Sequence, residues 1–168
     1  YGVPCFDYRI SDLKNLPRNT VGNGHNMRHD DLIFGMLENY REISGFKSAP
    51  VIECNTIYGD QLWFVYAVII TNSRARDDNG YIFPDYFIDV SDAKFAEYIA
   101  EIDKRKLYTT GVDINPTDKI LTLSTCCYDF DEARLVVVAR MRRAGESASV
   151  NTSNAMEKTN PSAADSRW

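Results

Sequence analysis

Three long runs of β-branched and aromatic residues limit what this chain can fold into. They cover Gln61 to Thr71, Lys119 to Thr125 and Leu135 to Met141, and the last run contains three consecutive valines. Residues of these types favour strands, where their side chains pack on a pleated surface. The chain is therefore expected to build a substantial β-sheet.

Shorter patterns complete the predicted sheet. Pro50 to Tyr58 is another β-rich run, and the Tyr58-Gly59-Asp60 turn predicts a hairpin with the strand that follows. A further strand is expected near Asn19 to Val21, after an irregular opening segment at 1–17. About six strands with two helices indicate a mixed, mainly antiparallel β barrel.

Two segments have the apolar periodicity of amphipathic helices. The first is expected to begin at Asp30 and to end at Gly45. Its apolar stripe consists of Ile33, Met36, Leu37, Tyr40 and Ile43. The second runs from Ser91, which can cap it, to about Lys106. Between them, the aromatic stretch at 81–87 contains a central proline and is predicted to be a loop.

The composition fits one domain followed by a tail. With 168 residues, 44% of them hydrophobic, the chain can fill one sizeable core, which we assign to residues 1–143. From Ala144 onward the sequence has no apolar period, so residues 144–168 are predicted to be a flexible tail. No stretch approaches the ~20 apolar residues of a membrane span. Because the sequence begins at Tyr1 without an initiator Met, we expect an N-terminal anchor and first elements to be missing.

The charged residues and the cysteines exclude two classes of function. A formal net charge of −5, with one short basic cluster at 140–143, argues against a nucleic-acid surface, which needs clustered Lys and Arg. The four cysteines match neither paired CxxC metal ligands nor a dense disulfide framework. Adjacent Cys126 and Cys127 on a strand should face opposite sides, so at most one can point into a given cleft.

Three residues suited to acyl transfer follow or begin strands. Cys126 ends one predicted strand, Arg134 opens the next strand across the hairpin, and His25 follows the strand far upstream. A thiolate attacks a carbonyl, but a free thiol with a pKa of about 8.5 is mostly protonated at neutral pH, so neighbouring cations are needed. His25 can donate a proton to a leaving amine, and Arg134 can donate hydrogen bonds to an oxyanion.

These residues also carry a family resemblance. The segment at 122–126, Thr-Leu-Ser-Thr-Cys, resembles the Thr-Leu-x-Thr-Cys signature of sortases, and Arg134 lies where sortases place their arginine. The Gly-His-Asn-Met segment at 24–27 is similar to the one that holds the sortase histidine. The opening segment at 4–9 and the helix expected at 91–106 resemble features of class B sortases.

The resemblance implies a fold and a reaction. The fold would be a closed mixed β barrel, with one helix after the histidine segment and a long helix before the cysteine strand. The enzyme would be a cysteine transpeptidase that forms a thioacyl intermediate on Cys126 and needs no cofactor or metal. Its partners would be a sorting-signal peptide, Asn-Pro-x-Thr-like or Leu-Pro-x-Thr-Gly-like, and a peptidoglycan amine. The resemblance places such an enzyme on the extracytoplasmic face of a Gram-positive cell membrane, held by an anchor that precedes this segment.

Four further residues are candidates for contact with the substrate. Ser124 shares the face of the strand with Cys126, and Thr125 adjoins it. Tyr81 and Ile82 lie where class B sortases contact the sorting signal. Ser124 and Thr125 could instead be plain strand residues, and packing is the alternative role for Tyr81 and Ile82.

The residues leave several alternatives open. The chain could be a cysteine protease whose acyl-enzyme is hydrolysed, or a sortase-like barrel that binds without catalysing. His29 competes with His25 as the proton carrier, and Arg134 could simply pair with Glu132. The remaining cysteines, Cys5, Cys54 and Cys127, are interpreted as packing residues.

Overall fold

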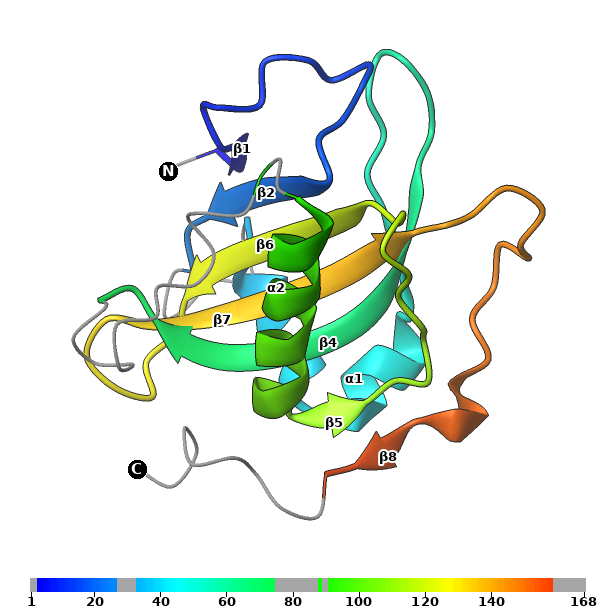
Figure 1. Cartoon of the computed structure of the whole chain (residues 1–168). Coiled ribbons are helices and arrows are strands. Elements are labelled where there is room, and N and C mark those ends of the chain that lie inside the picture. Colours follow the sequence, from blue (N-terminus) through cyan, green and yellow to red (C-terminus); the bar gives the residue numbers. More distant parts are fainter. Residues whose placement is uncertain (1–2, 27–32, 75–87, 89–90, 159–168) are drawn as a thin grey trace.

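The computed structural model describes residues 3–26, 33–74, 88 and 91–158, and it is built on one mixed sheet (Figure 1). Its strands are β1 (Cys5–Phe6), β2 (Asn19–Gly24), β3 (Val51–Glu53), β4 (Leu62–Asn72), β6 (Ile120–Cys126) and β7 (Ala133–Met141). They are arranged in the order β1-β2-β6-β7-β4-β3. The β2·β6 pair is parallel and the other pairs are antiparallel, which confirms the predicted mixed and mainly antiparallel sheet.

The sheet is curled like a half-barrel and does not close (Figure 1). β1 and β3 form its two edges, and no strand pairing joins them within the described residues. The predicted closed barrel is therefore wrong in this respect, because closure requires the edge strands to exchange backbone hydrogen bonds. Apolar side chains from both edges instead line a cavity of about 370 Å³, which they share with Phe34 and Leu37.

Helix α2 (Asp92–Arg105) covers one face of the sheet (Figure 1). The Ser91 hydroxyl accepts a hydrogen bond from the Lys94 amide at the start of the helix, as the sequence predicts. Phe95, Tyr98 and Ile102 are buried against the sheet. Leu37 and Phe46, from the helical segments at 35–48, pack with β4 residues on the opposite face. β4 is therefore buried on both sides, which fits its almost continuously apolar sequence.

The helix predicted from Asp30 to Gly45 can be compared with the structure from residue 33, because Asp30 itself lies outside the described residues, and the described part differs from the prediction. A 3₁₀ helix, η1 (Gly35–Arg41), is followed by the short helix α1 (Ile43–Ser48), so Gly45 lies inside a helix and does not end one. Ile33 has φ 62°, a left-handed conformation that a continuous right-handed helix cannot contain. At Gly45, a Cβ atom would lie 1.8 Å from the Asn39 carbonyl oxygen, so glycine permits the close approach of α1 to η1.

The predicted hairpin is present, with a shorter first strand than expected. β3 ends at Glu53, and the chain turns at residues 56–59, where Thr56 and Gly59 exchange backbone hydrogen bonds of 3.0 and 3.1 Å. Ile57 and Tyr58 at the tip are largely exposed. The strand expected to reach Tyr58 therefore ends earlier. Beyond it, the Cys54 amide still donates a 3.0 Å hydrogen bond to the Gln61 carbonyl, and the Gln61 amide donates a 3.1 Å bond to the Asn55 side chain.

The segment after residue 143 is not an unstructured tail as far as Lys158. Its strand β8 (Met156–Glu157) pairs with β5 (Tyr108–Thr109), and Ala155 is buried in the core. Glu146 forms two hydrogen bonds of 2.8 and 3.0 Å with Arg140, whose side chain is only 3% exposed. Specific side-chain contacts thus order a segment whose composition alone predicts flexibility, and they occupy part of the basic cluster at 140–143.

No helix in the described part of the chain is both long enough and apolar enough to cross a membrane.

Candidate active site

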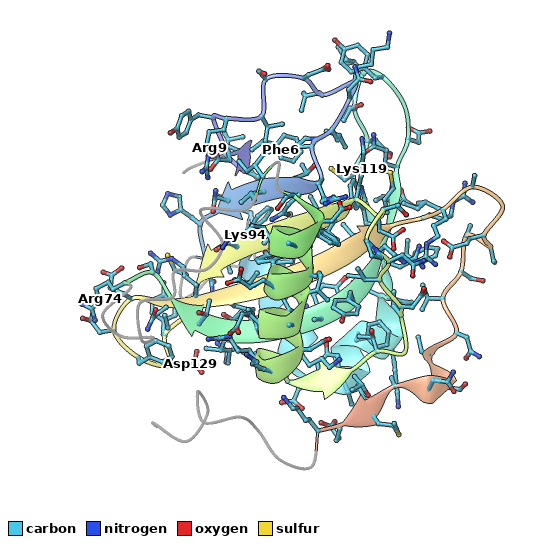
Figure 2. The ribbon with its side chains drawn as sticks, viewed as in Figure 1. Phe6, Arg9, Arg74, Lys94, Lys119 and Asp129 are labelled. Atoms are coloured by element: carbon cyan, nitrogen blue, oxygen red, sulfur yellow. The ribbon has the colours of Figure 1, made fainter. Side chains whose placement is uncertain are left out.

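Strand pairing brings the three candidate residues to one end of the sheet. Cys126 is paired directly with Arg134 across β6 and β7, as the predicted hairpin requires. On the other side of β6, the parallel ladder with β2 ends at the pair Gly24 and Thr125. His25 and Cys126 each follow that last pair by one residue. Asp129, in the loop after β6, and Arg74, after β4, lie at the same end of the sheet (Figure 2).

A cavity of about 270 Å³ opens at this end and contains most of the predicted site. Its walls include all three candidate catalytic residues, Cys126, His25 and Arg134, together with Ser124 and Thr125. The remaining lining residues are Val3, Cys5, Asn23 and Gly24. Tyr81 and Ile82 lie outside the described residues, and so does His29, the alternative proton carrier.

Burial separates the residues of this cavity into two groups. His25 is exposed and Cys126 is partly exposed, so both can meet a substrate. Ser124 and Thr125 are 5% and 2% exposed, and the Thr125 hydroxyl donates a 2.8 Å hydrogen bond to the Gly24 carbonyl. Thr125 therefore joins the two strands in addition to lining the cavity.

Gly24 has a steric role immediately before the candidate histidine. A Cβ atom there would lie 2.6 Å from the ring of Phe34. The Phe34 amide in turn donates a 3.2 Å hydrogen bond to the His25 carbonyl. Glycine therefore lets the segment at 33–34 pack directly on the chain that carries His25.

Arg134 is held by its neighbours in sequence and remains partly accessible. Its Nη1 donates to the Ala133 carbonyl at 2.9 Å, and its Nη2 lies 3.4 Å from Oε2 of Glu132. The side chain of Arg134 is 25% exposed. The ion pair with Glu132, foreseen as an alternative role, is therefore present together with a place in the cavity wall.

The two adjacent cysteines face opposite sides, as strand alternation predicts. Cys126 lines the cavity, whereas Cys127 is 4% exposed and belongs to the hydrophobic core. Burial, together with a hydrogen bond to the Asp129 carboxylate, raises the pKa of Cys127 to about 12. Of these two thiols, Cys126 has the accessibility that a nucleophile requires.

The chemistry available here is that of a thiol, an imidazole and a guanidinium group. In the described residues, no cluster of three or more His, Cys, Asp or Glu side chains could hold a metal ion. A thiol with a proton carrier and a fixed cation nearby is the arrangement that covalent acyl transfer uses.

Comparison with known proteins identifies the family. Sortase B of Staphylococcus aureus is 31% identical over 142 residues, which are 83% of this chain and 54% of that protein. A solved Staphylococcus aureus sortase B–substrate complex superposes with a TM-score of 0.71 at 28% identity, over 86% of this chain and 63% of that one. A sortase B complexed with triglycine gives a TM-score of 0.71 at 28% identity, over 86% and 64% of the two chains. No model of a protein family matches the chain.

The chain belongs to the sortase family, class B. It spans about half the length of the curated relatives it matches. Six residues of the motifs that carried the sequence resemblance line one cavity: Gly24, His25, Ser124, Thr125, Cys126 and Arg134.

Two residues that sequence reasoning did not single out also join the ends of β2 and β6. Nδ2 of Asn26 donates a 3.0 Å hydrogen bond to the Cys126 carbonyl, and the Tyr128 hydroxyl donates a 2.8 Å bond to the Asn26 carbonyl. Asn26 appears in the sequence only as part of the Gly-His-Asn-Met segment. The pairing of β2 with β6, which brings these positions together, connects residues about 100 positions apart.

Proposed function

We propose that this chain is the catalytic part of a cysteine transpeptidase. The observation that carries the proposal is the presence of Cys126, His25 and Arg134 in the wall of one cavity, with Cys126 paired to Arg134 across a hairpin. Membership of the class B sortases supports the same activity.

The proposed reaction has two acyl-transfer steps. Sγ of Cys126 attacks the carbonyl carbon of a peptide bond, the C–N bond breaks, and His25 donates a proton to the leaving amine. The resulting thioester is then attacked by the amine of an acceptor, which forms a new amide and releases the thiol. Arg134 donates hydrogen bonds to the substrate carbonyl or to the oxyanion that develops from it. No external cofactor is needed for this balance of atoms.

The proposed substrates are a sorting-signal peptide and a cell-wall amine. One relative was solved as a substrate complex and another with triglycine, which supports a peptide donor and an amine acceptor. We infer an Asn-Pro-x-Thr-like or Leu-Pro-x-Thr-Gly-like signal and a peptidoglycan amine. Ser124 and Thr125, which are mostly buried but line the cavity, are proposed to contact the signal there, as are Tyr81 and Ile82. We further propose that the enzyme acts on the extracytoplasmic face of a Gram-positive cell membrane, where an anchor holds it.

Mass spectrometry tests the proposed reaction directly. The protein is mixed with each signal peptide and an excess of triglycine, beside a Cys126→Ala variant. We expect a peptide joined to triglycine, and we expect the variant to give none. Cleavage without ligation would identify a hydrolytic protease instead. If neither peptide is cut and Cys126 also resists alkylation, a barrel that only binds would be the better interpretation.

A further inference from the structure

The geometry points to Asn26 as a positioning residue that holds His25 beside Cys126. Its side-chain amide nitrogen donates two hydrogen bonds, one of 3.0 Å to the Cys126 carbonyl and one of 2.8 Å to Oε1 of Glu38. This inference rests on the proposed function, because it concerns the relative placement of the nucleophile and the proton carrier.

The backbone alone does not provide this placement. The β2·β6 ladder ends at Gly24 and Thr125, so His25 and Cys126 both lie one residue beyond the last pair. Side chains continue the connection from there. Besides the two bonds of the Asn26 amide, the Tyr128 hydroxyl donates to the Asn26 carbonyl at 2.8 Å. Asn26 thus contacts the cysteine segment through both its side chain and its backbone.

An asparagine amide is well suited to this position because both of its partners are acceptors. The Cys126 carbonyl and the Glu38 carboxylate can each accept a hydrogen bond, and the NH₂ group offers two donor hydrogens. An aspartate has nearly the same shape but places acceptor oxygens against both partners. At neutral pH it would also bring a second carboxylate next to Glu38.

Glu38, which accepts one of the two hydrogen bonds from Asn26, is itself held by charged neighbours. Arg41 pairs with Glu38 and donates hydrogen bonds of 2.8 and 2.6 Å to the two carboxylate oxygens of Asp129. The hydrogen bonds from Arg41 hold the pKa of Asp129 below its ordinary value, so this carboxylate stays charged at neutral pH. Asp129 lies in the loop after β6, three residues after Cys126. The contacts therefore form a closed ring: Glu38 to Asn26, Asn26 to Cys126, and Asp129 through Arg41 back to Glu38.

The expected effect of losing Asn26 is on the chemical step. Misplacement of reacting groups by about 1 Å can cost a factor of ~10² in rate. We expect Asn26→Ala to lower kcat about 10-fold and Asn26→Asp to lower it about 100-fold, with KM changed less than about threefold. Glu38→Gln in the Asn26→Asp background should recover about fivefold, because it removes one of the two facing carboxylates. A residue with only a structural role would lower the melting temperature in this order, without the selective loss of kcat in the folded variants.

The test compares these variants with a matched control. Asn39→Asp makes the same change at an exposed position of η1 and should leave kcat and KM unchanged. Kinetics use the signal peptide that the wild-type protein ligates to triglycine. Thermal unfolding of each variant confirms that the fold is retained. An Asn26→Asp variant that is folded and keeps kcat within twofold of wild type would overturn the inference.

A second measurement does not depend on transpeptidation, so failure of the proposed function remains distinguishable. The rate at which iodoacetamide alkylates Cys126 is followed by peptide mapping, with and without His25→Ala. We expect His25→Ala to change this rate at least about threefold in the wild-type protein and by much less in the Asn26→Ala background, since His25 is then no longer held beside the thiol. An equal effect of His25→Ala in the two backgrounds would overturn the positioning role, whether or not any peptide is ligated.

Discussion

Iodoacetamide at pH 8 should alkylate Cys126 in the folded protein and leave Cys127 almost unmodified. The two thiols are adjacent in sequence, but Cys126 lines the cavity and Cys127 is 4% exposed in the core. Burial and the Asp129 carboxylate raise the pKa of Cys127 to about 12. Because the thiolate is the reactive form, protonation protects Cys127 in addition to burial.

The magnitude follows from the fraction of thiolate. At pH 8, a thiol with a pKa of about 12 is ionised in about one molecule in 10⁴, whereas an ordinary thiol with a pKa of about 8.5 is ionised in about one in four. A thiolate of higher pKa is also the stronger nucleophile, which returns a factor of about 25 to 60. Cys127 should therefore react about 40 to 100 times more slowly in the folded protein than in the unfolded chain, and steric exclusion of the reagent from the core should slow it further.

The assay is timed alkylation, followed by digestion and mass spectrometry. Trypsin releases both cysteines in the peptide at 120–134, so fragment ions must assign each label, and single Cys126→Ala and Cys127→Ala variants check the assignment. The same reaction in urea supplies the unfolded rate. If folded Cys127 reacts at more than about a tenth of its unfolded rate, the opposite orientation of the two thiols is refuted.

Two further predictions concern stability. Glu146→Ala should lower the free energy of unfolding by about 2 to 3 kcal/mol in urea titrations. The reason is that the buried Arg140 guanidinium then keeps only the more distant Asp113 carboxylate, at 3.7 Å, as its ion-pair partner. The control variant Glu157→Ala, at an exposed site, should cost less than about 0.5 kcal/mol. The melting temperature should also fall as the pH drops below about 4. Hydrogen bonds from Arg41 and Arg140 lower the folded-state pKa values of Asp129 and Glu146. The stability that these two carboxylates contribute is therefore complete above their unfolded-state pKa values, and it is lost as the pH falls through their folded-state pKa values. Arg41→Gln should flatten this acid limb, and an unchanged slope would contradict the assignment.

Sequence patterns alone predicted the local part of this protein correctly. The runs of β-branched residues predicted β4, β6 and β7, and the hairpin between β6 and β7 placed Arg134 opposite Cys126. Alternation along a strand also predicted that Cys126 and Cys127 face opposite sides, and the signature motif selected Cys126 as the one in the cavity. These features depend on residues that are close together in the sequence, so they can be predicted from the periodicity of apolar residues. The signature around Cys126 indicated the family because its five residues are contiguous in the sequence.

Tertiary structure decided what depends on distant contacts. The parallel pairing of β2 with β6 brings His25 and Asn26 to Cys126 across about 100 residues, and no local pattern specifies that register. The unclosed sheet and the packing of Gly45 against Asn39 follow from how the elements meet. Residues 144–158 are ordered by the contact of Glu146 with Arg140 and by the pairing of β8 with β5, which lies 47 residues upstream. The sequence by itself therefore determined the strands and the identity of the reactive groups. Tertiary packing determined how these groups are placed relative to one another, because that placement depends on contacts between residues far apart in the sequence.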